Sequence, residues 1–384
     1  MRRSPPVIAL LALATLALTT VAGAAAPTPP APDLDAGSYI LIDSQSGNVI
    51  AQKNADERMQ PASLTKLLTS YVVFAALKDG RLKLDDQVTI SEAAWHTGGS
   101  RTFVKVGSQV PVIDLIKGMI VQSGNDATVA LAERVGGTAA GFAQLMNQYA
   151  QRLGMKSSHF VDVDGLPDPQ HYTTARDLAT VANALVRDFP EYYYIFGLKY
   201  FTWNKIKQPN RNGLLWTDPS VDGLKTGHTD EAGYCLIASA KRNGTRLVSV
   251  VLKAPKWASR EADTEALLNY GFNFFQTEKF ASARTAILKP RVYESADGYA
   301  AIGAESDLYV TLPRGRAANI TTNAGLTNSR LIAPLAAGTV VGELTVTDGS
   351  GQVVGREPLV TLEAVPAGGL VTRTMDGIRL WFHH

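Results

Sequence analysis

Apolar residues follow two different periods along the first three quarters of the chain. Strand-like runs occur at 39–42 and 49–51, and again at 234–240 and 246–252. Between these pairs and after them, apolar side chains recur at helical spacing over 64–75, 112–119, 127–135, 139–153, 174–187 and 261–276. Strands at both ends with helices between them predict an α+β domain over residues 33–278, in which the two ends share one antiparallel sheet beside a helical cluster.

Short turns are expected within each pair of strands. Ser46-Gly47-Asn48 separates the first two runs, and Asn243-Gly244 separates the last two. Asn-Gly between two apolar runs is a strong signal for a tight hairpin. The pattern therefore predicts one hairpin near each end of the domain.

The pattern changes from about residue 281 onward. Short β-like runs separated by Gly, Asp and Asn occur at 285–288, 308–311, 340–346 and 359–362. This spacing predicts a small all-β sandwich domain over residues 281–365. The segment holds no ordered set of nucleophile, base and anion site, so we expect it to be a spacer or an interaction module.

The last segment, 368–384, has the pattern of an amphipathic helix. Its apolar residues recur near helical spacing, with charged residues between them: Leu370, Val371, Met375, Ile378, Trp381 and Phe382. Such a helix can lie flat in a membrane interface, with arginines toward anionic headgroups. The alternative is an ordinary helix docked on the protein. The flexible Pro366-Ala-Gly-Gly369 before it favours the membrane surface.

Residues 1–26 have the pattern of a secretory signal peptide. Arg2 and Arg3 precede an apolar run from Val7 to Val21, and small residues follow up to Ala26. Because a spanning helix needs about 20 apolar residues, a cleaved leader is favoured over a retained anchor. We therefore expect a periplasmic or other extracytoplasmic protein, peripheral on the outer face of the cytoplasmic membrane.

Charge and cysteine content exclude several function classes. The chain carries 37 basic and 35 acidic residues, and loss of the leader would leave 35 of each. A formally neutral chain gives no indication of a nucleic-acid partner. Cys235 is the only cysteine, and no His-x-x-x-His or Cys/His cluster supplies metal ligands. The sequence therefore implies no disulfide, no metal and no organic cofactor.

Three short motifs occur in a fixed order along the first domain. They are Ser63-Leu-Thr-Lys66, Ser123-Gly-Asn125 and Lys225-Thr-Gly227. The first and third are each unique in the chain, whereas Ser-Gly-Asn occurs once more, in the predicted turn at Ser46. Each motif alone is weak evidence. The ordered set of three is a strong signal for a serine acyl-transfer site.

The first motif supplies a nucleophile and a base. Ser63 and Lys66 are three positions apart on a predicted helix, so their side chains share one face. A serine hydroxyl becomes a good nucleophile only when a base takes its proton. A lysine serves as that base when burial or a second cation lowers its pKa. Lys225 is the natural second cation.

The second motif supplies a polar clamp and a proton carrier. Asn125 can hydrogen-bond both Lys66 and a substrate amide. Ser123 can relay a proton toward the leaving amine, as general acid–base catalysis requires. Taken singly, Asn125 is equally typical of a helix N-cap.

The third motif predicts where the substrate lies. Lys225-Thr226-Gly227 is expected to form an edge strand that faces the helix of Ser63, and a substrate would pair with it as an added strand. Gly227 would let that substrate approach the backbone closely. The backbone N–H groups of Ser63 and His228 would then form the oxyanion hole.

With these motifs the chain resembles the low-molecular-mass penicillin-binding proteins, serine-type D-alanyl-D-alanine carboxypeptidases of the peptidase S11 type that act on bacterial cell walls. Further segments carry the resemblance, namely Lys225-Thr-Gly-His-Thr-Asp230 with Gly233-Tyr234, Asn210-Arg-Asn-Gly-Leu-Leu215 and Gly165 to Leu178. The resemblance covers nearly the whole chain. It implies a transpeptidase- or β-lactamase-like domain, then a β-sandwich, then a membrane-anchoring amphipathic tail.

The resemblance also implies roles for individual residues. The catalytic set would be Ser63, Lys66, Ser123, Asn125 and Lys225, and the substrate strand would include Thr226, Gly227 and His228. Arg260, in Ser259-Arg-Glu-Ala262, would hold the substrate's terminal carboxylate together with Thr226, because a guanidinium binds a carboxylate in bidentate fashion. Arg211 matches another basic position of the family.

The expected reaction follows from these roles. Ser63 attacks the amide between the last two D-alanines of a peptidoglycan stem pentapeptide, D-alanine leaves, and water releases the tetrapeptide from the acyl-ester. β-Lactams mimic the D-Ala-D-Ala end and are expected to acylate Ser63 covalently.

Other enzyme classes fit the sequence less well. A class A β-lactamase would carry Glu-x-x-x-Asn between the second and third motifs, but no glutamate lies between Glu133 and Glu191 and Glu191-Tyr-Tyr-Tyr-Ile195 lacks the asparagine. An α/β-hydrolase would show Gly-x-Ser-x-Gly, which is absent. A D,D-endopeptidase that cuts crosslinks remains an alternative, since the same residues would cleave the same type of bond. An inactive cell-wall scaffold is disfavoured by the intact motifs.

Overall fold

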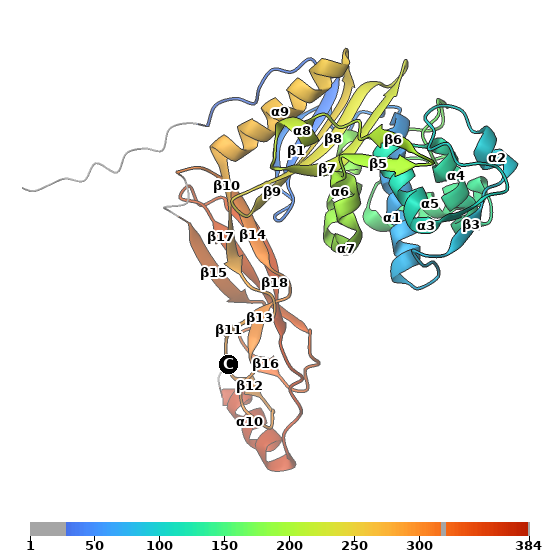
Figure 1. Ribbon diagram of the computed structural model, residues 1–384. Helices are drawn as coiled ribbons and strands as arrows, with labels where there is room; N and C mark the ends of the chain where they lie inside the picture. The colour runs from blue at the N-terminus through green and yellow to red at the C-terminus, as the bar shows by residue number, and fades with distance from the viewer. Residues whose placement is uncertain (1–27, 316–319, 383–384) are drawn as a thin grey trace, which may run out of the picture.

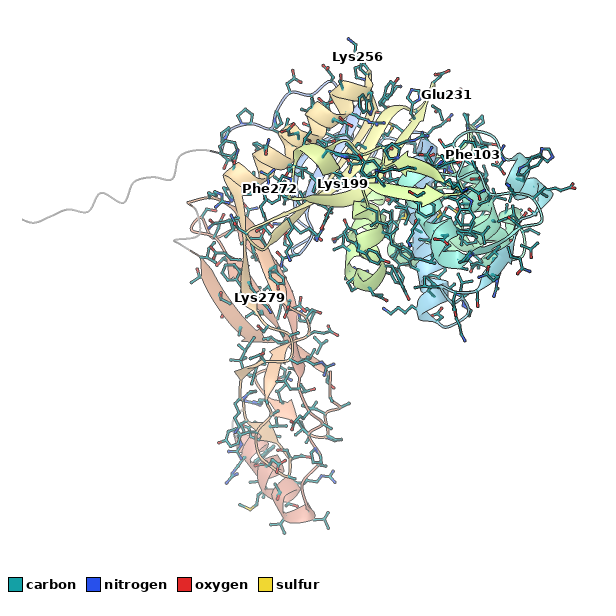
Figure 2. All side chains as sticks on the ribbon, viewed as in Figure 1. Phe103, Lys199, Glu231, Lys256, Phe272 and Lys279 are labelled. Atoms are coloured by element: carbon teal, nitrogen blue, oxygen red, sulfur yellow. The ribbon has the colours of Figure 1, made fainter. Side chains whose placement is uncertain are left out.

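The computed structural model describes residues 28–315 and 320–382. The predicted signal peptide at 1–26 and the final His383 and His384 lie outside the described residues. The described chain forms an α+β part and an elongated β-rich part, and the junction follows one long helix (Figure 1). Phe272, near the end of that helix, lies at the junction, and Lys279 lies within the second part (Figure 2).

A five-stranded antiparallel sheet forms the centre of the first part. Its strand order is β2-β1-β9-β8-β7, so the first two strands of the chain pair with three strands from the far end of the segment. The strands are β1 (Ser38–Asp43), β2 (Val49–Lys53), β7 (Val221–Thr229), β8 (Gly233–Arg242) and β9 (Thr245–Ala254). This arrangement confirms the predicted sheet and places Lys225 on its edge strand, β7.

Both predicted hairpins are confirmed. β1 and β2 are joined through Gly47, whose φ is 73°. β8 and β9 are joined through Asn243 and Gly244, with φ of 49° and 86°. Positive φ at both central residues is the turn geometry that Asn-Gly favours.

Helices cover both faces of the sheet. α9 (Trp257–Phe274) packs against β8 and β9 on one face (Figure 1), where Leu236 and Leu267 belong to one apolar core. The other face carries the larger core and the helical cluster around α1 (Lys66–Lys78), which is buried from Lys66 to Leu77 because its residues are apolar or small on nearly every side. The predicted helix at 261–276 differs at both ends, since α9 begins after the extended Lys256 and strand β10 takes over at Phe275.

The other elements of the first part are short segments or members of the helical cluster. They are η1 (Ala62–Thr65), β3 (Gln87–Thr89), α2 (Glu92–His96), β4 (Gln109–Pro111), α3 (Val112–Lys117), η2 (Gly118–Gln122), α4 (Asn125–Gly136), α5 (Ala139–Leu153), α6 (Ala175–Asp188), α7 (Pro190–Tyr193), η3 (Tyr194–Gly197), β5 (Tyr200–Trp203), β6 (Ile206–Pro209) and α8 (Leu214–Thr217). β3 pairs with β4, and β5 pairs with β6.

The second part is β-rich, as predicted. A five-stranded sheet has the order β11-β13-β18-β17-β15, β10 pairs with β14, and β12 pairs in parallel with β16. The strands are β10 (Phe275–Ala281), β11 (Ala286–Leu288), β12 (Val292–Tyr293), β13 (Ile302–Ala304), β14 (Leu308–Pro313), β15 (Thr321–Leu326), β16 (Leu331–Ile332), β17 (Val340–Thr347) and β18 (Val353–Thr361). Val310, Leu344 and Leu359 lie in its own apolar core.

The predicted C-terminal helix is present as α10 (Leu370–Phe382), at the far end of the second part near β12 (Figure 1). Asp376 holds it there, accepting hydrogen bonds from the Arg291 guanidinium at 2.9 Å and from the Glu294 N–H at 2.9 Å. The apolar side chains point outward: Leu370 is 83% exposed and Trp381 is 72% exposed. Among residues 28–315 and 320–382, no helix has the length and apolarity needed to cross a membrane.

Candidate active site

Ser63 and Lys66 lie where η1 passes into α1, packed against the edge strand β7. The Lys66 Nζ donates a hydrogen bond to Ser63 Oγ at 3.0 Å and another to the main-chain oxygen of Asp164 at 2.7 Å. Ala62, just before the serine, has a φ of 48°, a strained conformation that surrounding structure must hold. The fold thus places the predicted nucleophile and base in direct contact.

The Lys66 amine lies in a nearly dry environment, since the residue is 1% exposed. Burial lowers the pKa of Lys66 to about 8, the carboxylates of Asp164 and Asp162 oppose this shift, and the Arg211 guanidinium adds to it. A base with a pKa near the working pH is what general-base catalysis requires.

Lys225, which we predicted as the second cation, lies close enough to Lys66 for the two amines to interact. Burial lowers the pKa of Lys225 well below its usual value, and the nearby Lys66, Arg211 and Arg260 lower it further. Arg211, which we did not predict in this role, is a further cation that lowers the pKa of Lys66. The Lys225 Nζ donates to the main-chain oxygen of Thr226 at 2.9 Å.

Ser123 lies at the end of η2 in a left-handed conformation with a φ of 66°. Its side chain is buried, and its Oγ has no hydrogen-bond partner in the part of the chain that the structure describes. The next position, Gly124, requires glycine, because a Cβ there would lie 2.0 Å from Thr102 Oγ1. The sharp bend therefore leaves the Ser123 hydroxyl free to bond a ligand.

Asn125 begins α4 and differs from our prediction. Its Nδ2 donates to the main-chain oxygen of Gly98 at 2.7 Å, and its buried Oδ1 has no partner among the residues described. No hydrogen bond joins it to Lys66 within that set, in which the Lys66 amine donates to Ser63 and Asp164. The free Oδ1 is left to accept from a ligand amide.

The edge strand β7 passes close to η1. A Cβ on Gly227 would lie 3.0 Å from the Pro61 oxygen and 3.2 Å from the Ala62 Cβ, so a larger residue would displace the turn that carries Ser63. Thr226 is buried beside it, whereas His228 is exposed and its ring lies 4.0 Å from that of Tyr234. Because Ser63 lies in the first turn of η1, its backbone N–H has no acceptor within that helix.

Two arginines face each other beside this strand. Arg260, on α9, is 4% exposed and donates to the main-chain oxygen of Arg211 at 3.3 Å, while its buried Nε has no partner within the described residues. Burial lowers the pKa of Arg260 to about 10 and also lowers that of Arg211. Two partly desolvated guanidiniums with unused donors form a site for a carboxylate.

These groups surround one cleft of about 590 Å³. The predicted residues among its lining are Ser63, Ser123, Arg211, Thr226, Gly227, His228 and Arg260. Lys66, Asn125 and Lys225 are buried beneath that surface. The remaining lining includes Tyr234, from a segment that carried the family resemblance, and Ser100, Trp216 and Trp257, which no short motif marks. No group of His, Cys, Asp or Glu suited to a metal occurs in the described part of the chain.

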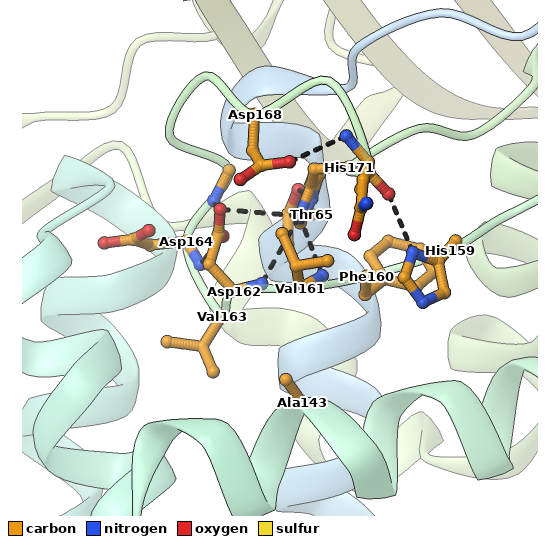
Figure 3. Close-up of polar contacts among 12 residues, drawn as sticks. Thr65, Ala143, His159, Phe160, Val161, Asp162, Val163, Asp164, Asp168 and His171 are labelled. Atoms are coloured by element: carbon orange, nitrogen blue, oxygen red, sulfur yellow. Dashed lines mark hydrogen bonds and ion pairs between the residues drawn. The ribbon is translucent and has the colours of Figure 1, made fainter.

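The loop at 161–171 packs against η1 (Figure 3), and from Gly165 onward it belongs to a segment that carried the family resemblance. His171 is 1% exposed, and its Nε2 lies 2.8 Å from the Oγ1 of Thr65. Thr65 lies between the nucleophile and the base in sequence. Burial lowers the pKa of His171. Asp162 and Asp164, which precede the segment from Gly165 onward, were not predicted as part of the site.

Comparison with known proteins gives a consistent family. Residues 24–256 match the family described as D-alanyl-D-alanine carboxypeptidase, peptidase S11, and residues 275–367 match the penicillin-binding protein 5 C-terminal domain. The D-alanyl-D-alanine carboxypeptidase DacA of Escherichia coli is 44% identical over 363 residues, which cover 93% of this chain and 90% of DacA. DacC of the same organism is 45% identical over 367 residues, which cover 94% and 92%.

Solved structures agree with this family. Penicillin-binding protein 5 from Haemophilus influenzae is 43% identical and superposes with a TM-score of 0.84, covering 88% of this chain and 99% of that protein. Penicillin-binding protein D2 from Listeria monocytogenes, in its ampicillin-bound form, is 33% identical with a TM-score of 0.59 and covers 63% of this chain and all of that one.

Proposed function

Because this chain belongs to the peptidase S11 family and is a serine-type D-alanyl-D-alanine carboxypeptidase that binds penicillin, we propose that Ser63 carries the acyl group and Lys66 is its base. The observation that supports this assignment most strongly is the 3.0 Å contact between Lys66 Nζ and Ser63 Oγ. The lowered pKa of Lys66, about 8, leaves a useful fraction of free amine at neutral pH.

Acylation then has defined proton movements. The free amine of Lys66 takes the hydroxyl proton as Ser63 Oγ bonds to the carbonyl carbon, and the backbone N–H groups of Ser63 and His228 stabilise the oxyanion. As the C–N bond breaks, Ser123 Oγ donates its proton to the leaving D-alanine nitrogen and takes one back from the Lys66 ammonium, which returns Lys66 to the free amine. The unpaired state of that hydroxyl in the described residues supports this role.

The substrate is held at both of its ends. The terminal carboxylate binds Arg260 with Thr226, and Arg211 contributes positive charge beside it. The buried, unpaired Arg260 Nε supports this, because a carboxylate would satisfy it. Asn125 Oδ1 accepts from the substrate's upstream amide, and the peptide pairs with β7 at Gly227.

The substrate class follows from this geometry and the family. A peptidoglycan stem pentapeptide ends in D-Ala-D-Ala, and removal of its last residue leaves a tetrapeptide ester on Ser63, which water hydrolyses. β-Lactams acylate the same serine.

The tail carries a second proposed property, association with the outer face of the cytoplasmic membrane. α10 presents Leu370, Val371 and Trp381 outward while Asp376 ties the opposite side to the protein. An outward apolar face with arginines beside it is the pattern of a helix that lies in a lipid interface.

The catalytic proposal is tested with diacetyl-Lys-D-Ala-D-Ala by measuring released D-alanine. Wild type releases it, and Ser63→Ala does not, at unchanged thermal unfolding. Benzylpenicillin adds one adduct to wild type in intact-protein mass spectra and none to Ser63→Ala. D-alanine release by the alanine variant would overturn the assignment.

The membrane proposal is tested by flotation with vesicles that contain an anionic lipid. The full mature chain floats with them, and a chain lacking residues 370–384 stays in solution while it hydrolyses the tripeptide at the same rate. Equal flotation of both chains would disprove the anchor without touching the catalytic assignment.

A further inference from the structure

Three contacts join the loop 161–171 to the turn that carries the nucleophile, and Figure 3 draws His171 and Thr65, the pair that forms the first of them. His171 Nε2 reaches Thr65 Oγ1 at 2.8 Å, and the Asp164 main-chain oxygen accepts from Lys66 Nζ at 2.7 Å. Gly165, with a φ of 86°, packs so tightly that a Cβ there would lie 1.8 Å from the Ala62 oxygen. The loop and the catalytic turn are therefore fixed to each other on both sides of Ser63.

Internal hydrogen bonds make this loop rigid. Thr65 Oγ1 donates to the Ala62 oxygen at 2.9 Å, so His171 Nε2 must be the donor toward Thr65. His171 Nδ1 is then an acceptor, facing the N–H groups of Val161 and Asp162 at 3.3 and 3.4 Å. Asp162 Oδ1 accepts from the N–H groups of Asp164 and Gly165 at 3.0 and 2.6 Å. The position of Asp164 is thus set by its neighbours.

The carboxyl of Asp164 is buried without enough hydrogen bonds to compensate for the free energy that its burial costs. The residue is 3% exposed, and its Oδ2 has no hydrogen-bond partner in the described chain. Its carboxyl points away from His171 (Figure 3). The carboxyl has hydrogen bonds with the Leu166 N–H and the Asp162 side chain, and Oδ2 is left over among the residues described. A buried carboxylate oxygen without a partner opposes folding, so it indicates a functional role. Because its own main-chain oxygen touches Lys66 Nζ, standard bond lengths put the carboxyl carbon within about 7 Å of that amine.

We propose that Asp164 is a positioning residue for Lys66: its main-chain oxygen fixes the amine beside Ser63, and its ionised carboxylate keeps that amine charged until the pH rises. The inference rests on the proposed function, since it concerns the base of the same reaction. Asp164 touches neither substrate nor Ser63.

Other charged groups also face Lys66. Asp162 comes from the same loop, Asp126 from α4, Arg211 from the segment after β6 and Lys225 from β7. Asp126 accepts main-chain hydrogen bonds from three residues of the 102–104 loop, and Asp162 is partly in solvent with two such bonds. Asp164 is the carboxylate with an uncompensated oxygen in a dry setting, where its field is least screened.

The direction of the effect follows from the two pKa values. Burial raises the pKa of Asp164 to about 6, and burial lowers that of Lys66 to about 8. Between these values the carboxylate and the ammonium coexist and stabilise each other. Removal of the carboxylate lowers the pKa of Lys66, so more free base exists in this pH window. Acylation should therefore become faster there.

The experiment measures the second-order rate constant of acylation by a fluorescent penicillin from pH 5.5 to 9. In Asp164→Asn, the midpoint of the rising limb moves down by about one pH unit, which makes acylation about fivefold faster at pH 7. The wild-type and variant rates converge above pH 9, where both amines are free. The matched control is Asp168→Asn, in the same loop, whose Oδ1 accepts only from the Gln170 N–H and whose profile stays that of wild type.

Asp164→Ala keeps the main-chain oxygen, lacks the carboxyl and is expected to shift the midpoint in the same direction. It also serves if the asparagine variant fails to fold. An unchanged midpoint in folded variants, including a uniform loss of rate at every pH, overturns the proposal and leaves Asp164 a packing residue. Absence of any acylation in wild type would instead overturn the proposed function.

Discussion

The two parts of the molecule differ in how they treat buried polar atoms. Within residues 28–315 and 320–382, the buried side-chain atoms without hydrogen-bond partners all belong to the first part, on Arg101, Thr102, Ser123, Asn125, Asp164, Trp203, Gln208, Ser249 and Arg260. Several of these surround or underlie the cleft. In the second part, the buried polar side chains are bonded, as Ser295 is to Val292 and Gly298.

Backbone strain occurs beside the catalytic groups as well. Ala62 and Ser123 have positive φ, which costs free energy in residues other than glycine, although Arg284 and Glu294 of the second part have positive φ too. The first part thus contains buried polar atoms whose missing hydrogen bonds lower its stability, and a ligand can supply those hydrogen bonds. Within the described residues of the second part, the buried polar side chains have no such missing hydrogen bonds. Substitutions at the cleft should therefore lower activity without lowering stability. Substitutions in the core of the second part should lower stability without lowering activity.

The largest effect is expected for Lys66→Met. Loss of the proposed base should lower acylation by penicillin roughly 10³- to 10⁴-fold. The same change should raise the free energy of unfolding at pH 7 by about 2 kcal/mol, because the buried amine has a pKa below its unfolded value and opposes folding at every pH below that value. Acylation kinetics and urea unfolding test both.

The matched control is Lys78→Met, at the exposed end of the same helix. It should leave the acylation rate unchanged. A loss of stability in Lys66→Met would contradict the view that the buried Lys66 amine lowers the free energy of unfolding.

The converse change is Leu359→Ala in the second part. Leu359 is 0% exposed in the core it shares with Val310 and Leu344, so truncation leaves a cavity and should cost about 3 kcal/mol of the stability of that part. Hydrolysis of diacetyl-Lys-D-Ala-D-Ala should stay at the wild-type rate. Hydrogen exchange over 280–365 measures the first effect. A parallel fall in kcat/KM would show that the two parts are energetically coupled.

Arg260→Gln should lower kcat/KM about 100-fold, mainly through KM, because the neutral amide cannot form a charged bidentate contact with the terminal carboxylate. Stability should be unchanged or slightly higher, since Arg260 forms a single 3.3 Å hydrogen bond to Arg211 and its Nε is unpaired among the described residues. Steady-state kinetics and thermal unfolding are the measurements.

Arg242→Gln is the paired control. Arg242 bonds Asp218 and Asn269 away from the cleft lining. Its loss should cost about 1 kcal/mol of stability and no activity. Equal behaviour of the two arginine variants would remove the distinction between site and scaffold.

Short-range signals account for what could be predicted from the sequence. The Asn243-Gly244 turn, the apolar period of α1 and the three-residue spacing of Ser63 and Lys66 are all set within a few positions of the chain. The pairing of strands from both ends of the first part in one sheet also follows, because the strands at those ends have only each other as partners.

The missing features depend on contacts that side-chain identity does not mark. Lys66 binds a main-chain oxygen of Asp164, and any residue could supply that oxygen. Asn125 is turned toward the Gly98 oxygen by the course of a loop. Arg211 lowers the pKa of Lys66 because the fold brings its guanidinium near that amine, which sequence spacing cannot reveal. Long-range desolvation, more than residue type, decides these roles.

The smallest effect is expected for Asp376→Ala, which tests the second part at its far end. Asp376 ties α10 to the Arg291 guanidinium and to the Glu294 N–H, and partly exposed pairs of this kind contribute about 0.2–1 kcal/mol. Hydrogen exchange over 370–382 should rise by a few fold, with no change in hydrolysis or in unfolding of the first part. A change in hydrolysis would show that the far end of the second part affects the cleft. The two parts would then not be independent of each other.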